Sequence, residues 1–215
     1  MKTIQKPNII GQGAKAVLST PGWGKLLIVI ITLPILLFIS GDWAISAQVN
    51  NPWARQAPLP TGRSLNSVDM ISATEGWAVG EGGVILHTLD GGAFWTPQNS
   101  GTTGPLHDVR FLDALHGWAT SGNTILFTTD GGQSWGAGSG VIGSLYAVDF
   151  ADLSRGWAVG NGGAIYRTTD GGLNWSLQTS PTTSGLSEVD FVDNNNGWAV
   201  GANGTILRTS DGGAA

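Results

Sequence analysis

One stretch of the chain combines a hydroxyl, a carboxylate, two glycines and an indole, the groups expected of a loop that binds a cation or a sugar. It reads TTDGGQSW at residues 128–135. Related stretches are TLDGGAFW at 88–95, TTDGGLNW at 168–175 and the shorter TSDGGAA at 209–215. Each Asp could equally accept hydrogen bonds from nearby turn amides, with the glycines adopting positive φ. Because a catalytic site would break the symmetry of four equivalent copies, we favour the structural role.

The enzyme hypothesis that these residues raise is a sialidase-like glycosidase, with a glycan-binding propeller as its non-catalytic form. Such hydrolysis requires three convergent Arg side chains, a Tyr nucleophile with a partner Glu, and an Asp that acts as acid and base. Arg167 and Arg208 occupy one repeat position, where the other copies have His87 and Phe127. This predicts a place at the periphery of each repeat rather than a cluster on the axis. We therefore expect no catalytic residues and no enzymatic activity.

Metal and cofactor sites are not expected either. The chain has no Cys, which excludes thiolate ligands and disulfides. His87, His107 and His116 show no shared metal-ligand spacing. The residues therefore predict neither a bound metal nor a cofactor.

The boxes belong to a longer repeat. A GWA segment precedes each box, starting at Gly76, Gly117, Gly156 and Gly197. The Trp-to-Trp steps are 41, 39 and 41 residues, and the steps between the box Asp residues are 40, 40 and 41. A matching segment stands before each GWA: LNSVDMIS, LHDVRFLD, LYAVDFAD and LSEVDFVD. Each unit predicts four short strands separated by turns rich in Asn, Asp and Gly.

Four-stranded units of about 40 residues are typical of β-propeller blades. The 34 glycines and the lack of a 3.6-residue apolar stripe exclude a helical solenoid. We therefore predict an all-β fold, a propeller of four four-stranded blades over residues 53–215, preceded by one transmembrane helix. The predicted structural box residues are Asp90, Asp130, Asp170, Asp211, Trp95, Trp135 and Trp175.

Trp53 predicts how the ring of blades closes. A Trp opens the fourth strand after each of the first three boxes, and Trp53 has no blade before it. If PWARQAP at 52–58 completes the sheet of the last blade, four whole blades form a closed ring without exposed strand edges. An open arc and a longer parent chain remain alternatives.

Positions that differ among the repeats are the better candidates for contacts with a partner. After the first-strand Val the repeats have Asp69, Arg110, Asp149 and Asp190, which would form a ring on the channel. Such a ring fits salt bridges better than a cation site, because Arg110 neutralises part of it. Before each GW stand Glu75, His116, Arg155 and Asn196, in a loop at one rim. The candidate partner-binding residues are Arg110, Arg155, Arg167, Arg208, Glu75 and His116.

Charge and hydropathy change sharply along the chain. All four Lys precede residue 26, and no acidic residue precedes Asp42. The rest holds six Arg and fifteen Asp or Glu, a formal charge of −9, which argues against nucleic-acid binding. Between the two parts lies an apolar run at residues 26–39. Trp23 and Trp43 flank this run about 30 Å apart on a helix, which places one at each membrane interface.

We interpret the run as a single-pass anchor in the inner membrane. The alternative is a cleaved signal peptide, for which AIS at 44–46 is a passable cleavage site. The basic start predicts a cytoplasmic N-terminus and a periplasmic propeller. The predicted organisation is a cytoplasmic segment (1–25), a transmembrane helix in contact with the lipid bilayer (26–45), a short linker (46–52) and the propeller (53–215).

The S/T-x-D-x-G-x-x-W boxes resemble the Asp-box, or BNR repeat, of sialidases and related propellers. The longer pattern GWAVG…GTILRT(T/S)DGG…W, with L-x-x-V-x-F between boxes, resembles the photosystem II stability and assembly factor family over residues 53–215. Members of that family are typically seven-bladed, whereas this chain has four repeats. They bind newly made or assembling reaction-centre subunits through an arginine-rich face and have no known catalysis. The resemblance implies a scaffold that binds and stabilises a membrane protein complex, a photosynthetic reaction centre or its light-harvesting antenna.

Overall fold

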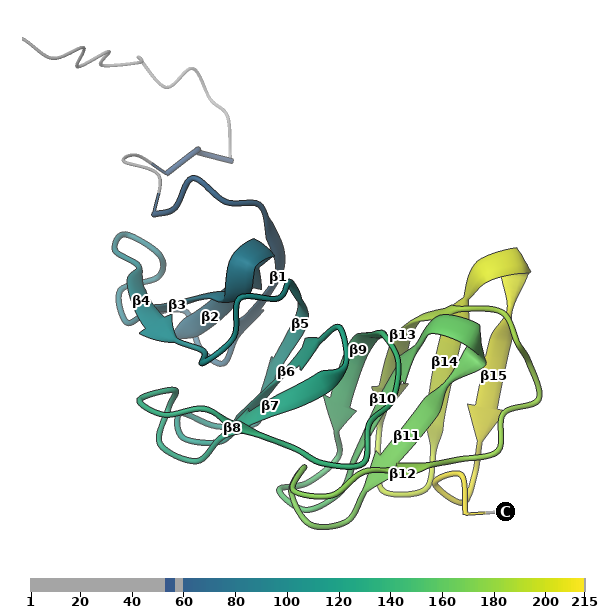
Figure 1. Cartoon of the computed structure of the whole chain (residues 1–215). Helices are drawn as coiled ribbons and strands as arrows, with labels where there is room; N and C mark the ends of the chain where they lie inside the picture. The colour runs from purple at the N-terminus through teal and green to yellow at the C-terminus, as the bar shows by residue number, and fades with distance from the viewer. Residues whose placement is uncertain (1–52, 57–59, 215) are drawn as a thin grey trace, which may run out of the picture. The chain divides into compact units, whose positions relative to one another are not determined.

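The computed structural model describes residues 53–56 and 60–214. This part of the chain forms four antiparallel sheets, one for each repeat (Figure 1). The first sheet contains β1 (Leu65–Met70), β2 (Gly76–Gly80), β3 (Val84–Thr88) and β4 (Thr96–Asn99). The second contains β5 (Leu106–Phe111), β6 (Gly117–Ser121), β7 (Thr124–Thr128) and β8 (Gly136–Ala137). The third contains β9 (Leu145–Phe150), β10 (Gly156–Gly160), β11 (Ile165–Thr168) and β12 (Ser176–Leu177). The fourth contains β13 (Leu186–Phe191), β14 (Gly197–Gly201) and β15 (Ile206–Thr209).

Each sheet is a meander in which strands that follow one another in the sequence pair with one another. The turn between the second and third strands is a single 3-10 turn in three of the blades: η1 (Glu81–Gly83), η2 (Asn161–Gly163) and η3 (Ala202–Gly204). The middle residue of each turn has a positive φ, 67° at Gly82, 66° at Gly162 and 58° at Asn203. Gly and Asn tolerate this left-handed region best, which explains the Asn and Gly pairs before each third strand.

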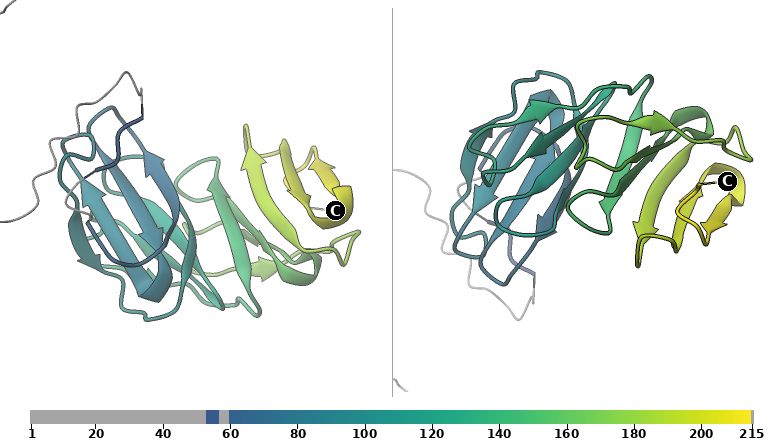
Figure 2. Two further views of the ribbon diagram at one scale, coloured as in Figure 1. Left: turned by 90° about the horizontal axis from the view of Figure 1, so that it is seen from above. Right: turned by 90° about the horizontal axis from the view of Figure 1, so that it is seen from below.

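The hydrophobic core lies between neighbouring blades rather than inside one. The first strands β1, β5, β9 and β13 lie side by side in chain order (Figure 2). Between the first two blades the core consists of Trp77, Val79 and Ile85 packed with Leu106, Val109 and Phe111. The next two interfaces reuse the same repeat positions. The Trp77 and Phe111 rings stack with their centroids 3.5 Å apart, so each GWA Trp is an anchor between blades.

The prediction of an all-β fold built from four blades is confirmed for the described residues. The predicted cytoplasmic segment, transmembrane helix and linker lie outside them, as do Trp23 and Trp43. Residues 53–56 and 60–214 contain no helix long and apolar enough to cross a bilayer. The fourth sheet has three strands among the described residues. Completion of that sheet by the segment at Trp53 stays a prediction.

The segment 53–56 contacts the first blade. The Oε1 atom of Gln56 accepts a hydrogen bond from the indole of Trp95, at 2.7 Å. Gln98 and Gln178 stand at the same distance after a box Trp as Gln56 stands after Trp53. Gln98 donates to the Gly131 carbonyl in the next blade, so Gln at this position contacts the box of the following repeat.

Candidate interaction surface

Each box is a turn whose polar groups bond to one another. In the second blade the Thr128 hydroxyl donates to Asp130 Oδ1 (2.8 Å) and accepts from Gly132 N (2.9 Å). Asp130 Oδ1 also accepts from Ser134 N at 2.9 Å. Gly131 and Gly132 have φ values of 73° and 84°, which the tight turn requires. The first and third boxes repeat all of these bonds. The last box keeps the two bonds of the Thr209 hydroxyl, and its Asp211 accepts from Gly213 N and Ala214 N.

The box carboxylates therefore accept hydrogen bonds from groups of their own turns. Ser134 Oγ donates to Asp130 Oδ2 at 2.6 Å, and this bond, with the Ser134 N–H, lowers the pKa of Asp130 to about 2. The Asn174 side chain does the same for Asp170 at 2.8 Å and lowers its pKa. The backbone N–H of Phe94 lowers the pKa of Asp90. Hydrogen bonds that favour the charged carboxylate explain all three shifts.

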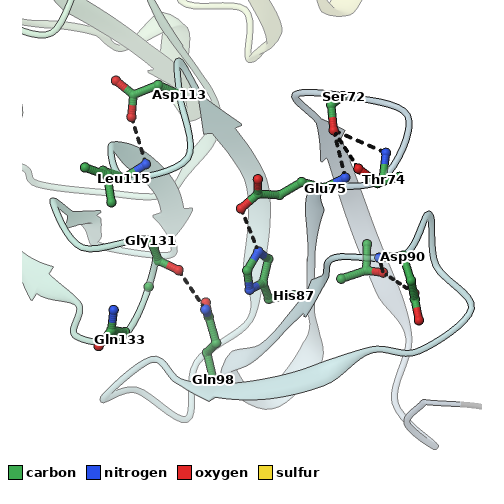
Figure 3. A network of polar contacts seen from close by, with 12 residues as sticks. Ser72, Thr74, Glu75, His87, Asp90, Gln98, Asp113, Leu115, Gly131 and Gln133 are labelled. Atoms are coloured by element: carbon green, nitrogen blue, oxygen red, sulfur yellow. Dashed lines mark hydrogen bonds and ion pairs between the residues drawn. The ribbon is translucent and has the colours of Figure 1, made fainter.

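The box turns join the loops between the first and second strands to make one rim of the blades. In every blade a box Gly donates its N–H to a carbonyl of that loop, as from Gly91 to Thr74 and from Gly131 to Leu115 (2.8 and 2.9 Å). Figure 3 shows this region in the first two blades, with the bond from Gln98 to Gly131 crossing between them. We call these turns and loops together the box rim.

Three predicted partner-binding residues lie on the box rim, each in a different blade. Glu75 Oε1 lies 3.2 Å from His87 Nε2 within the first blade (Figure 3). His116 Nδ1 lies 3.0 Å from the Asp113 carboxylate within the second. Arg155 is exposed and donates its backbone N–H to Asp152 (2.8 Å). The structure places the three on one rim but does not bring them together in one pocket.

The box rim also presents apolar side chains that the sequence analysis did not select. Phe94 and Leu89 lie within the first box and are strongly exposed. The other exposed apolar residues of the rim are Leu115, Leu153, Leu173 and Val192. Their signal in the sequence was the presence of Leu, Val or Phe at turn positions where a polar residue would suffice. Apolar groups rimmed by charge are typical of interaction surfaces.

The remaining three predicted arginines have separate partners. Arg110 Nε lies 3.1 Å from Asp149 Oδ1, across the interface between the second and third blades. Arg167 lies over the ring of Trp157, 5.8 Å from its centroid, and Arg208 lies over Trp198 at the same distance. Arg167 and Arg208 therefore cover the GWA indoles by cation–π contacts.

The first-strand carboxylates bond to neighbouring blades. Asp69 Oδ2 accepts from Phe111 N (2.6 Å), and Asp149 Oδ2 accepts from Phe191 N (2.7 Å). Burial raises the pKa of Asp149, against the N–H of Phe191 and the charge of Arg110. Burial likewise raises the pKa values of Asp108 and Glu188. Within the described ranges, no group of three or more His, Asp or Glu could hold a metal ion.

A cavity of about 360 Å³ opens between the third and fourth blades. Its lining includes Trp157, Phe191 and Trp198, with Arg208 and Asp211 at the box of the fourth blade. In the second and third blades, a box Trp packs edge-on against the Phe that corresponds to Phe191. The lining of the cavity is thus mixed, with three aromatic rings among aliphatic and polar residues of the third and fourth blades.

No protein-family model matches the chain, and no curated protein does. Among solved structures, YCF48 bound to D1 peptide is similar to it, with 29% identity and a TM-score of 0.59 over 71% of this chain and 51% of that one. YCF48 from Cyanidioschyzon merolae has 26% identity and a TM-score of 0.59, over 72% of this chain and 55% of that one. An ancestral GH74 enzyme has 14% identity and a TM-score of 0.60, over 74% of this chain and 24% of that one.

These similarities support different conclusions about the chain. The GH74 likeness shows the propeller fold alone, because the identity is low. The two YCF48 structures support the resemblance to photosystem assembly propellers that the repeat pattern indicates. The chain spans about half the length of these two structures.

Proposed function

We propose that this chain is a membrane-anchored, non-catalytic propeller that binds a photosynthetic membrane protein complex, a reaction centre or its antenna, and stabilises it or helps to assemble it. The observation that carries the proposal is the similarity to YCF48 bound to D1 peptide, at 29% identity. That structure supports binding of a photosystem protein by a propeller of this kind. The bilayer anchor at residues 26–45 and the periplasmic location rest on the sequence pattern alone.

The absence of catalysis is part of the proposal. The box carboxylates, which are the most repeated polar groups, are taken up by turn hydrogen bonds. Arg110, Arg167 and Arg208 face three different partners instead of converging on one carboxylate site. Of the two tyrosines, Tyr166 is buried and bonds to the backbone of Ile142. These contacts support the proposal that the chain has no sialidase-like site.

We place the contact with the partner on the box rim. Its exposed apolar side chains supply area that association can bury, and its charges differ from blade to blade, which would select one orientation of a partner. Leu153 and Arg155 lie in one loop of this rim and are both exposed. Ile142 lies in the connection from β8 to β9, at the opposite end of the blades, and is even more exposed.

The test is a purification of the tagged full chain from its native membranes under mild detergent, with identification of co-purifying proteins by mass spectrometry. Reaction-centre or antenna subunits in the eluate would support the function. Their absence, with other proteins present, would overturn it. A double variant, Leu153→Ser with Arg155→Glu, should lose those subunits, whereas Ile142→Ser should keep them. Equal retention by both variants would move the contact away from this part of the box rim.

A further inference from the structure

Two neighbouring blades carry a histidine beside a carboxylate on the box rim. In the first blade His87 Nε2 lies 3.2 Å from Glu75 Oε1 (Figure 3). In the second blade His116 Nδ1 lies 3.0 Å from each oxygen of the Asp113 carboxylate. Histidine side chains change charge between about pH 5 and 8, whereas surface carboxylates stay charged over that range. Each pair is therefore negative when its imidazole is neutral and has no net charge when the imidazole is protonated.

The position of His87 holds a permanent cation in two other blades. Arg167 and Arg208 stand there, each 5.8 Å from the centroid of the GWA indole that it covers. His87 stacks on Trp77 in the first blade, with the ring centroids 4.4 Å apart and the planes 10° apart. Phe127 stands at this position in the second blade. A cation is attracted to the face of an indole, so the first blade has this attraction only when its imidazole is protonated.

The position of His116 varies among the blades in the same way. Arg155 stands there in the third blade and is charged throughout this pH range. Asn196 stands there in the fourth blade and donates its side-chain N–H groups to both oxygens of Asp193, at 3.2 and 3.0 Å. His116 makes the same contact with Asp113, through a ring whose charge depends on pH. The repeats thus contain a permanent cation and a neutral donor at the position of His116.

The elements around His87 bring no second free charge to it. Its strand partners are Trp77 on β2 and Thr96 on β4, which are both uncharged. The box carboxylates of the first two blades, Asp90 and Asp130, accept hydrogen bonds from their own turns. Glu75 is therefore the carboxylate that responds to the charge of His87.

The carboxylate of the second pair is held by its own loop. Asp113 accepts the backbone N–H groups of Leu115 and His116, both at 2.8 Å. Burial raises the pKa of Asp113, but these bonds and the His116 imidazole outweigh it and lower the pKa. The box carboxylate of the third blade, Asp170, is bonded to Asn174. The charge of the second pair therefore changes at the imidazole.

We propose that the two pairs make the box rim a pH-sensitive surface, which binds the partner complex more tightly as the pH falls from about 8 to about 5. This inference rests on the proposed function. The exposed side chains of Leu89, Phe94 and Leu115 lie on the same part of the rim, so the partner surface that fits is apolar and lacks basic groups. Burying a carboxylate beside such a surface costs free energy unless a neighbouring cation neutralises it. Protonated imidazoles supply that cation in both blades.

The repeats of the chain supply the variants that test this proposal. His87→Arg with His116→Arg places permanent cations at both positions, as in the third blade. His87→Phe with His116→Asn places there the neutral residues of the second and fourth blades. Each new residue already stands at its position in another blade, so folding should be retained, and circular dichroism at both pH values checks it. His107→Gln is the matched control, because His107 packs edge-on against Tyr146 at the end of β5 farther from the rim.

The measurement is retention of solubilised reaction-centre and antenna complexes from native membranes on the immobilised full chain, at about pH 8 and about pH 5.5 and one ionic strength. The unchanged chain and His107→Gln should retain several-fold more at the lower pH. The double Arg variant should retain the higher amount at both pH values, and the Phe and Asn variant the lower amount at both. These results together support the proposal.

Retention by the unchanged chain that is independent of pH, or that is stronger at the higher pH, would overturn this inference and leave the proposed function standing. The same pH ratio in both double variants as in the unchanged chain would also overturn it, because the titrating group would then lie elsewhere. Retention at neither pH by any chain would contradict the inference and the proposed function together.

Discussion

The interfaces between blades have counterparts in two exposed groups of side chains: Leu65, Val68 and Met70 of the first blade, and Trp198, Val200 and Ile206 of the fourth. Residue types at matching repeat positions are similar, with Met70 in place of a Phe, but their burial differs. Trp157 is buried between the Arg167 side chain and the Phe191 ring, whereas Trp198 has the Arg208 side chain on one side only. Val109 is buried and Val68 is exposed, although both follow the same L-x-x-V pattern. The local sequence therefore determines which apolar side chains lie on one face of a blade. Whether these side chains are buried depends on a neighbouring blade that packs on that face.

The largest expected difference in stability is between variants that remove the Trp157 and Trp198 indoles. Trp157→Ala should lower the free energy of unfolding by about 3–5 kcal/mol, because it leaves a cavity at a filled interface. Trp198→Ala should cost clearly less, because the Trp198 side chain is 37% exposed and leaves no closed cavity. Urea unfolding followed by circular dichroism measures both. Equal losses would show that the Trp198 ring is as well covered as that of Trp157.

The first-strand leucines test the other side of the interface. Leu106 is fully buried and Leu65 is exposed, at equivalent positions in β5 and β1. Leu106→Ala should cost about 2–5 kcal/mol. Leu65→Ala should stay within roughly 1 kcal/mol, as at other exposed sites. The midpoint of urea unfolding reports both values, and a Leu65→Ala loss as large as that of Leu106→Ala would contradict the exposure assigned to the first blade.

The boxes give a smaller contrast. In Thr128→Val the buried N–H of Gly132 loses its acceptor, which should cost about 1–3 kcal/mol. Thr209 accepts from Gly213 N in the same way, at 2.9 Å, but that N–H is only partly buried. Asp211 Oδ1 also accepts from that N–H, at 3.0 Å, so Thr209→Val should cost less. Thermal unfolding of the two variants measures the difference, and a reversed order would contradict the structural role of the box hydroxyl.

The smallest expected effect concerns the charge of one box. Asp130 has a folded-state pKa of about 2, below its ordinary 3.8, because Ser134 donates to its carboxylate. A depressed pKa stabilises the folded state above the ordinary value, and this stabilisation is lost as the pH falls from about 4 through 2. Ser134→Ala should raise the Asp130 pKa toward 3.8, as measured by NMR titration of the carboxyl carbon. Asp90, which has Phe94 in place of Ser134, should titrate unchanged in that variant and serves as the internal control.

Repetition made much of this protein predictable. The steps of about 40 residues, the GWA segments and the Asp-Gly-Gly turns predicted all-β blades, and the structure confirms the blades at those positions. The structural role of the boxes follows from the bonds between Thr128, Asp130 and Gly132. The apolar residues of the box rim were missed, because an exposed Leu in a turn has no periodicity that marks it.

The sequence by itself determined the strand pattern, the turn chemistry and which side chains each blade offers to a neighbour, because these depend on alternation and on residues that tolerate positive φ. Only the tertiary structure decided which offered side chains are buried. Trp157 and Trp198 stand in the same GWA context, and no local signal separates them. Their difference arises from the Phe191 ring that packs on one of them, a contact between residues brought together by the stacking of blades. For the same reason, the sequence could not show which groups the arginines contact. The tertiary structure pairs Arg110 with Asp149, and Arg167 and Arg208 with two indoles.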